Sequence, residues 1–179
     1  MERRQLLNRI DEYAGRWPLE SEVVARFRAL VDAHQNCFER DCWAGHITGS
    51  AWLVNASGTH VLLTHHRKLE RWLQLGGHSD GDPDTLAVAV KEAREESGLD
   101  VHAVSNRIFD LDVHEIPARK RDPAHFHFDM RFALRTQDSE TFAVSQESLD
   151  LAWVPIVDVA NYTQEDSVLR MVRKWTEMA

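Results

Sequence analysis

The stretch GGHSDGDPDTLAVAVKEAREESGL, residues 76 to 99, constrains the fold more than any other part of the sequence. Its first half is rich in glycine and aspartate, which favours a loop. Its second half predicts a helix over about Thr85 to Ser97, with Asp84 or Thr85 as the N-cap and Gly98 at the end. The sequence thus predicts a loop that leads directly into a helix with well-defined ends.

Three glutamates gather near the end of this expected helix. At about 100° per residue, Glu92, Glu95 and Glu96 fall within about 100° of arc on its surface. Carboxylates in this position repel one another and oppose the helix dipole, which favours cations at a C-terminus. One interpretation is a solvated acidic helix end with Lys91 and Arg94 as local partners. The other is a site for a hard divalent cation, Mg²⁺ or Mn²⁺, which takes oxygen ligands and keeps substrate phosphates as co-ligands.

Helical and strand-like patterns follow one another along the rest of the chain. Apolar residues recur with helical spacing at the start, and the pattern becomes strand-like from Gly45 onward. This mixed order predicts an α+β fold or a three-layer α/β/α sandwich. We expect helices at residues 3–14, 20–33 and 164–177, and a hairpin of 46–54 with 59–65. Strands are expected at 71–75, 125–132 and 151–156, and a long or bent strand at 99–116.

Composition excludes several classes of function. The formal net charge of −8 argues against binding a nucleic-acid backbone, which requires clustered Lys and Arg. No apolar run approaches the roughly 20 residues that span a bilayer, and the charged N-terminus does not resemble a signal peptide. The only cysteines, Cys37 and Cys42, fit a reducing cytoplasm. We therefore expect a cytoplasmic protein that binds neither nucleic-acid polymers nor membranes.

The loop and helix resemble the Nudix box, the signature of the Nudix hydrolase family. That pattern is Gly, five residues, Glu, seven residues, then Arg-Glu-aliphatic-x-Glu-Glu-x-Gly-aliphatic. The chain matches it at Gly77 and from Glu92 to Leu99, whereas Pro83 replaces the first Glu and Lys91 replaces the Arg. In the family this Glu and Arg pair to brace the loop against the helix. Here Asp82 or Asp84 could pair with Lys91, although lysine lacks the bidentate fork of arginine.

The resemblance implies a Nudix-type α/β/α sandwich with a mixed β-sheet over residues 45–179, and an N-terminal helical extension, residues 1–44, packed on it. It implies hydrolysis of a diphosphate linkage in a nucleoside diphosphate derivative or related metabolite, with Mg²⁺ or Mn²⁺ activating a water. The expected partner is thus a small-molecule diphosphate, and Nudix domains often form homodimers. The residues implied are Glu92, Glu95, Glu96 and Gly77 for the metal, Glu92, Glu95 or Glu147 for the general base, and Arg67, Arg71 and Arg119 for substrate phosphates.

The histidines suggest a more distant resemblance to type I isopentenyl-diphosphate isomerase, which shares the Nudix fold. Its Cys-Gly-His-Pro motif corresponds to residues 76–79, so His78 would be a metal ligand. A second, histidine-containing site for another divalent metal would then use His46, His127 and Asp129, the last two from the polar face of the alternating strand HFHFDMRF, where His125 also lies. Gly76 replaces the catalytic cysteine, which makes isomerase activity the weakest interpretation. A Nudix-fold module that binds a nucleotide or metabolite without turnover is the other alternative.

Overall fold

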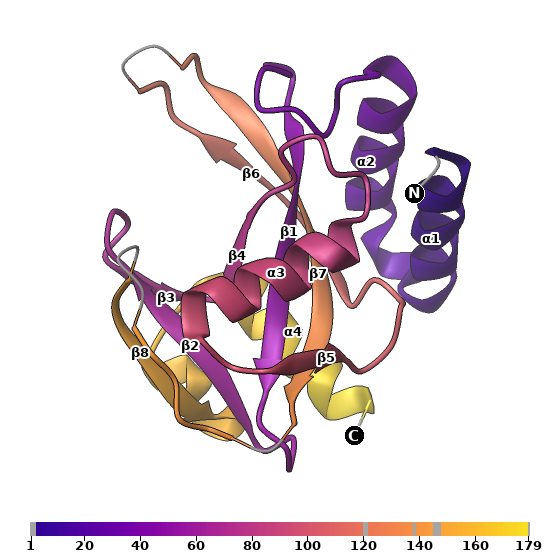
Figure 1. Ribbon diagram of the computed structural model, residues 1–179. Helices are drawn as coiled ribbons and strands as arrows, with labels where there is room; N and C mark the ends of the chain where they lie inside the picture. The colour runs from indigo at the N-terminus through magenta and orange to yellow at the C-terminus, as the bar shows by residue number, and fades with distance from the viewer. Residues whose placement is uncertain (1–2, 120–121, 138, 145–147, 179) are drawn as a thin grey trace.

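The computed structural model describes residues 3–119, 122–137, 139–144 and 148–178. A mixed sheet forms its centre, and helices cover both faces of the sheet (Figure 1). None of the helices described is long and apolar enough to cross a membrane. The elements are α1 (Arg3–Arg16), η1 (Pro18–Glu20), α2 (Ser21–Ala33), β1 (His46–Val54), β2 (His60–His66), β3 (Arg71–Leu73), β4 (Leu75–His78), α3 (Thr85–Ser97), β5 (Val101–Ala103), β6 (Asp110–Ile116), β7 (His125–Thr136), β8 (Ser148–Pro155), η2 (Ile156–Asn161) and α4 (Asp166–Met178).

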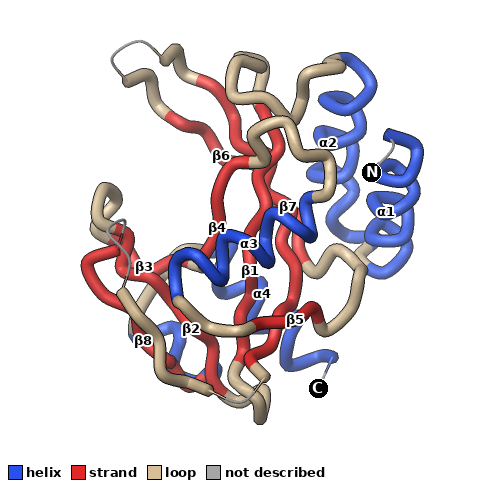
Figure 2. The backbone as a smooth tube through the Cα atoms, viewed as in Figure 1, coloured by secondary structure: helices blue, strands red, loops and turns tan. Residues whose placement is uncertain are grey.

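The two longest strands, β1 and β7, lie side by side at the centre of the sheet. They run parallel in a register that pairs His46 with His127 and Val54 with Arg135. The main strand order is β3-β2-β1-β7-β5, with β4 added to β1, β6 to β7 and β8 to β2 (Figure 2). All these other pairs are antiparallel.

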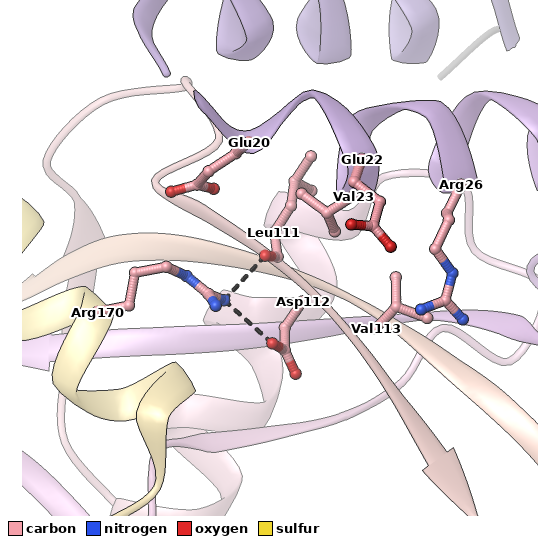
Figure 3. A pocket seen from close by; sticks show the side chains of 8 residues that line it. All are labelled: Glu20, Glu22, Val23, Arg26, Leu111, Asp112, Val113 and Arg170. Atoms are coloured by element: carbon pink, nitrogen blue, oxygen red, sulfur yellow. Dashed lines mark hydrogen bonds and ion pairs between the residues drawn. The ribbon is translucent and has the colours of Figure 1, made fainter. Parts of the chain in front are cut away.

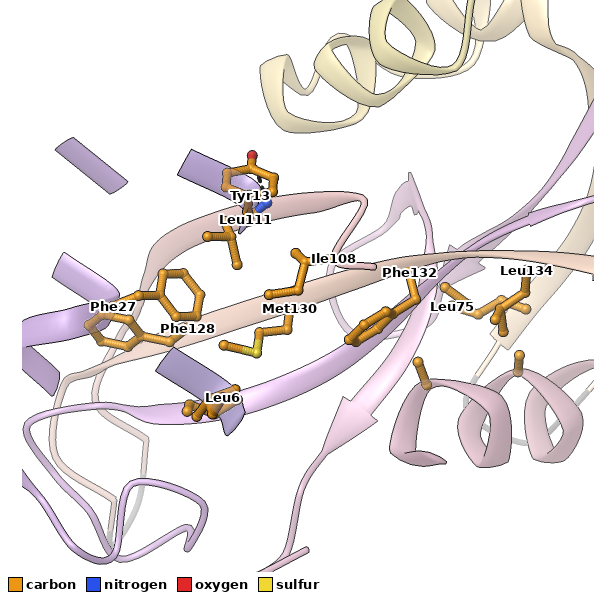
Figure 4. Close-up of a cluster of buried hydrophobic side chains, with 14 of the residues drawn as sticks. Leu6, Tyr13, Phe27, Leu75, Ile108, Leu111, Phe128, Met130, Phe132 and Leu134 are labelled. Carbon is orange, nitrogen blue, oxygen red and sulfur yellow. Dashed lines mark hydrogen bonds between the residues drawn. The ribbon is translucent and has the colours of Figure 1, made fainter. Parts of the chain in front are cut away.

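Each face of the sheet has its own apolar cluster. On one face the ring of Phe27 from α2 meets that of Phe128 from β7 edge-on, with 5.2 Å between centroids (Figure 4). Helix α3 lies on the same face and so close to β1 that a Cβ on Gly49 would be 2.7 Å from the carbonyl oxygen of Thr85. On the other face Trp175 of α4 packs in a second cluster. The predicted α+β fold with flanking helices is therefore confirmed.

Two strand predictions need correction. Residues 99–116 form no single strand, because the chain leaves the sheet between β5 and β6. The predicted strand 71–75 is two strands, and the second continues to His78 through Gly76 and Gly77, which pair with Ser50 and Gly49. Glycine is needed there because a Cβ at position 76 would lie 2.7 Å from the Cα of Ser50. The glycines expected in a loop are thus strand residues that permit close approach.

Candidate metal centre

Local capping signals position the acidic helix. The side chain of Asp84 accepts a hydrogen bond from the backbone NH of Ala87 at 3.4 Å, and Gly98 ends the helix with a φ of 70°. Of the two N-cap candidates, Asp84 is the cap. The helix therefore begins and ends where its sequence predicts, and its last two turns carry the three glutamates.

Two of these glutamates contact the glycines of β4. The backbone NH of Gly76 donates to Oε1 of Glu96 at 2.8 Å. A Cβ on Gly77 would lie 2.5 Å from Oε2 of Glu92, so the missing side chain is what admits that carboxylate. Glu96 is buried, whereas the side chain of Glu95 is 59% exposed. The cluster thus offers both buried and solvent-facing carboxylate oxygens beside strand β4, a donor set that suits a hard divalent cation.

Lys91 lies beside the glutamates and not beside the loop aspartates. Its Nζ is 3.5 Å from Oε1 of Glu92 and 3.7 Å from Oε2 of Glu95. These carboxylates, chiefly Glu92, raise the pKa of the Lys91 ammonium. Asp84 caps α3, and Asp82 accepts a hydrogen bond from the backbone of Asp84 at 2.8 Å. The lysine therefore offsets part of the repulsion among the glutamates instead of bracing the loop.

The loop between β4 and α3 is held from a different direction, by the segment between α2 and β1 (Figure 1). Nη2 of Arg40 donates to Oδ2 of Asp80 at 2.8 Å. The NH of Gly81 donates to the carbonyl of Phe38 at 3.0 Å, and a Cβ on Gly81 would lie 2.6 Å from Oε1 of Glu39. The hydrogen bond from Arg40 also lowers the pKa of Asp80. Contacts from before the first strand therefore brace the loop in which Pro83 replaces the family's glutamate.

Two of the three candidate phosphate ligands, Arg67 and Arg71, contact other protein groups through their side chains. Arg67 donates to the carbonyl of Ser148 at 2.8 Å, and Arg71 pairs with Glu165 at 2.7 Å. Arg119 is exposed on the segment between β6 and β7. Glu147, the loop candidate for the general base, lies outside the described residues.

A group of histidines lies where β1, β4 and β7 meet. Ligand nitrogens of His46, His125 and His127 all lie within 4.8 Å of one another. The ring of His78 is 5.2 Å from that of His46 and 4.9 Å from that of His127, centroid to centroid. Side chains alternate along a strand, so His78 points away from the face to which Gly77 belongs. The structure therefore groups His78 with the other histidines and not with the glutamates.

Asp129, expected beside these histidines, is engaged elsewhere. Its Oδ1 accepts from the hydroxyls of Thr48 at 2.9 Å and Ser50 at 2.6 Å. Its Oδ2 accepts from Gln74 at 3.1 Å and from Nε of Arg131 at 2.7 Å. The predicted set of His46, His127 and Asp129 therefore needs correction, because the third residue of the cluster is His125 and not Asp129. The alternating pattern of the strand already placed His125 on this face, and only its pairing with β1 brings it to His46.

A buried network of charged side chains around Arg131, next to Asp129, was not predicted from the sequence. Arg131 is 2% exposed and pairs with Asp110 at 3.1 Å and Asp112 at 3.3 Å, in addition to Asp129. Lys174 of α4 reaches Asp110 at 2.6 Å and the hydroxyl of Tyr13 at 2.6 Å. The network therefore ties α1 and α4 to the sheet.

One cleft opens beside this network, between α2, β6 and α4 (Figure 3). Its volume is about 270 Å³. Arg170, on its wall, donates to the carbonyl of Leu111 and to Asp112, both at 3.0 Å. The glutamate cluster is not part of its lining, which is Glu20, Glu22, Val23, Arg26, Leu111, Asp112, Val113 and Arg170.

The family model of the NUDIX domain matches residues 46–175. The chain belongs to the Nudix family. Both the predicted family and the predicted class of enzyme, a Nudix pyrophosphohydrolase, are thereby confirmed. A search of curated protein sequences gave no match.

Solved structures of Nudix proteins share the fold at low sequence identity. A Nudix-family hydrolase from Clostridium perfringens is 23% identical, with a TM-score of 0.54, over 75% of this chain and 98% of that chain. An Ap4A hydrolase from C. elegans is 13% identical, with a TM-score of 0.57, over 74% and 96%. The dihydroneopterin triphosphate pyrophosphohydrolase of E. coli is 15% identical, with a TM-score of 0.58, over 74% and 96%. These similarities establish the Nudix fold and leave the substrate open.

Proposed function

We propose that this Nudix enzyme hydrolyses a diphosphate linkage in a nucleoside diphosphate derivative or a related small metabolite, with Mg²⁺ or Mn²⁺ as cofactor. The observation that carries the proposal is the contact between the acidic helix and β4. Glu92 fills the space where Gly77 has no side chain, and Glu96 accepts from the NH of Gly76. A purely solvated helix end would not require that cradle.

In this proposal the metal is held by Glu92, Glu95 and Glu96 with the carbonyl of Gly77. When bound, the ion would polarise the phosphate oxygens and lower the pKa of a bound water. The roles of the glutamates follow from their surroundings. Glu96 is buried and hydrogen-bonded, which suits a fixed ligand, whereas Glu95 is exposed and can reach solvent. We assign the removal of the water proton to Glu95 or Glu92, with Glu147 as the candidate outside the described residues.

Arg67, Arg71 and Arg119 are proposed to contact substrate phosphates. The Arg71–Glu165 pair is solvent-exposed, so exchanging the carboxylate for a phosphate costs little. A homodimer and a cytoplasmic location remain predictions from the sequence. The excess of acidic over basic residues supports a small-molecule substrate over a nucleic-acid polymer.

Two alternatives differ in how well the geometry supports them. An isomerase would need its cysteine acid at position 76, where a Cβ would lie 2.7 Å from the Cα of Ser50. That crowding speaks against isomerase activity. A non-catalytic binding module draws support from Pro83 and Lys91, which depart from the family pattern. The Arg40–Asp80 pair supports the loop between β4 and α3 in place of the family's glutamate and arginine. That support favours the hydrolase over the binding module.

The test is release of phosphate or nucleotide from a panel of diphosphates in the presence of Mg²⁺. The panel includes Ap4A and dihydroneopterin triphosphate, the compounds named for two proteins of similar fold, with nucleotide sugars and nucleoside triphosphates. We expect Glu95→Gln and Glu96→Gln to lower kcat by about 10²- to 10⁴-fold. The matched control is Glu177→Gln, an exposed glutamate in the last turn of α4, which should keep full activity. Ligand-induced thermal stabilisation without any turnover would instead support the binding module.

A further inference from the structure

We propose that His46, His125 and His127 form a binding site for a divalent transition metal of the Zn²⁺ class, separate from the carboxylate cluster. Their ligand nitrogens lie within 4.8 Å of one another, and they come from the starts of two paired strands. Imidazole suits Zn²⁺, Co²⁺ and Ni²⁺, whereas carboxylate and carbonyl oxygens suit Mg²⁺ and Mn²⁺. Three histidines with a further coordination position open is a well-known arrangement for zinc.

The hydrogen bonding of His46 points to a ligand. The residue is 2% exposed, and neither of its ring nitrogens makes a hydrogen bond of ordinary geometry to any described residue. Buried polar atoms without partners are costly and are rare in native proteins. The backbone of Cys42 lies beside the ring and can serve one nitrogen, and a bound cation would take the lone pair of the other.

The partner of His125 fixes which of its nitrogens is free. Its Nδ1 lies 2.8 Å from the carbonyl oxygen of Pro123, which can only accept. The ring must therefore carry its proton on Nδ1 and present the lone pair of Nε2. Metal-binding histidines commonly use a backbone carbonyl in this way to fix tautomer and ring orientation.

His78 is a fourth histidine beside the three proposed ligands. The ring of His78 lies 4.9 Å from that of His127, which makes it the nearest candidate for a fourth ligand.

Strand β4 separates this site from the glutamates. Gly77 pairs with Gly49, which faces α3, whereas the neighbouring pair of His78 and Thr48 belongs to the opposite face. Asp129 takes no part, because both its oxygens already accept hydrogen bonds. Zinc binding at the histidines is therefore independent of the proposed hydrolysis.

The experiment measures zinc retained by the full chain after dialysis against buffer with excess Mg²⁺, which competes at the carboxylates. Mass spectrometry of the metal content should find a single zinc ion per wild-type chain. His125→Gln and His46→Gln should lose it. His102→Gln, at an exposed histidine of β5, should retain it, as should Glu95→Gln. The Co²⁺-loaded chain should show the visible absorption of a tetrahedral site, lost in the same two variants.

A second measurement needs no variant and so does not depend on folding. Imidazole ¹⁵N resonances of the wild-type chain are followed during titration with Zn²⁺. Shifts confined to the rings of His46, His125 and His127, with or without His78, support the site. A wild-type chain that retains no zinc and no cobalt overturns it, whatever the hydrolase assay gives. So does retention that depends on Glu95 and is indifferent to His125.

Discussion

Arg40 and Asp80, forty positions apart in sequence, join the segment before β1 to the loop that follows β4, with Nη2 of the guanidinium 2.8 Å from Oδ2 of the carboxylate. The pair lies outside the loop–helix contact that the family pattern would supply. It holds the loop from the side of the N-terminal helices. The position of the loop, and hence of Gly77 beside Glu92, should depend on this contact.

We therefore expect Arg40→Ala to lower kcat/KM for diphosphate hydrolysis by about 10-fold to 100-fold, because small displacements of binding groups have effects of this size. Stability should change little, since an exposed ion pair contributes at most about 1 kcal/mol to the free energy of unfolding. The control is Arg28→Ala, which removes the exposed pair with Asp11 between α2 and α1. Equal activity of the two variants would contradict a bracing role.

Gly77→Ala should abolish binding of Mn²⁺ while leaving the fold intact. The added Cβ would lie 2.5 Å from Oε2 of Glu92 and push that carboxylate away from the backbone. Calorimetric titration with Mn²⁺ measures the loss. Gly15→Ala in α1, where a Cβ meets nothing within 4 Å, is the control and should bind Mn²⁺ normally. Unchanged Mn²⁺ affinity in the Gly77 variant would place the metal elsewhere.

The buried network predicts loss of stability in acid. Burial acts to raise the pKa of Asp110, but the hydrogen bond from Arg170 and the charges of Arg131, Arg170 and Lys174 outweigh it, so the pKa is lowered. A lowered pKa stabilises the fold above the unfolded value of about 3.9. The free energy of unfolding should therefore fall as the pH drops below about 4, toward the pKa of the folded state.

Urea unfolding of the wild type between neutral and acid pH measures that fall directly. Asp110→Asn should unfold about 3–5 kcal/mol more easily at neutral pH, because it removes the buried carboxylate that Arg131, Arg170 and Lys174 share. Its stability should also depend less on pH below about 4. Asp158→Asn, an exposed carboxylate in η2, is the matched control and should behave as the wild type. A wild-type stability that does not change in acid would contradict the role of the network.

Tyr13→Phe should destabilise the chain by about 1–3 kcal/mol, the cost of leaving buried groups without a hydrogen-bond partner. Its hydroxyl accepts from Nζ of Lys174 at 2.6 Å and from the NH of Leu111 at 3.2 Å, and it donates to Glu20. Denaturant unfolding gives the difference. Tyr162→Phe, at an exposed tyrosine, should change stability little, and equal effects of the two substitutions would count against the network.

Local signals in the sequence predicted part of this structure well. The bounds of α3 are set by Asp84 and Gly98, whose preferences act within one helical turn. The alternation of β7 gave its two faces correctly, because side chains alternate on any strand. The family resemblance grouped Gly77 with Glu92, Glu95 and Glu96 as an expected metal site, and Glu92 lies beside Gly77 in the structure.

The features that were missed depend on contacts between distant residues. Burial of Arg131 requires α4, which lies some forty residues further along the chain. The grouping of His125 with His46 follows from the parallel register of β1 and β7, which sequence spacing does not encode. The strand expected over residues 99–116 breaks because residues 104–109 separate β5 from β6, whereas only residues 132–133 of β7 separate their partners.

The bracing of the loop from residues 38–40 has an evolutionary consequence. We expect support from a segment before the family's shared region to relax selection on the glutamate and arginine of the motif. Pro83 and Lys91 should then be tolerated without loss of activity. Among homologues, loss of the motif pair should coincide with presence of the N-terminal segment, and chains without that segment should retain the pair.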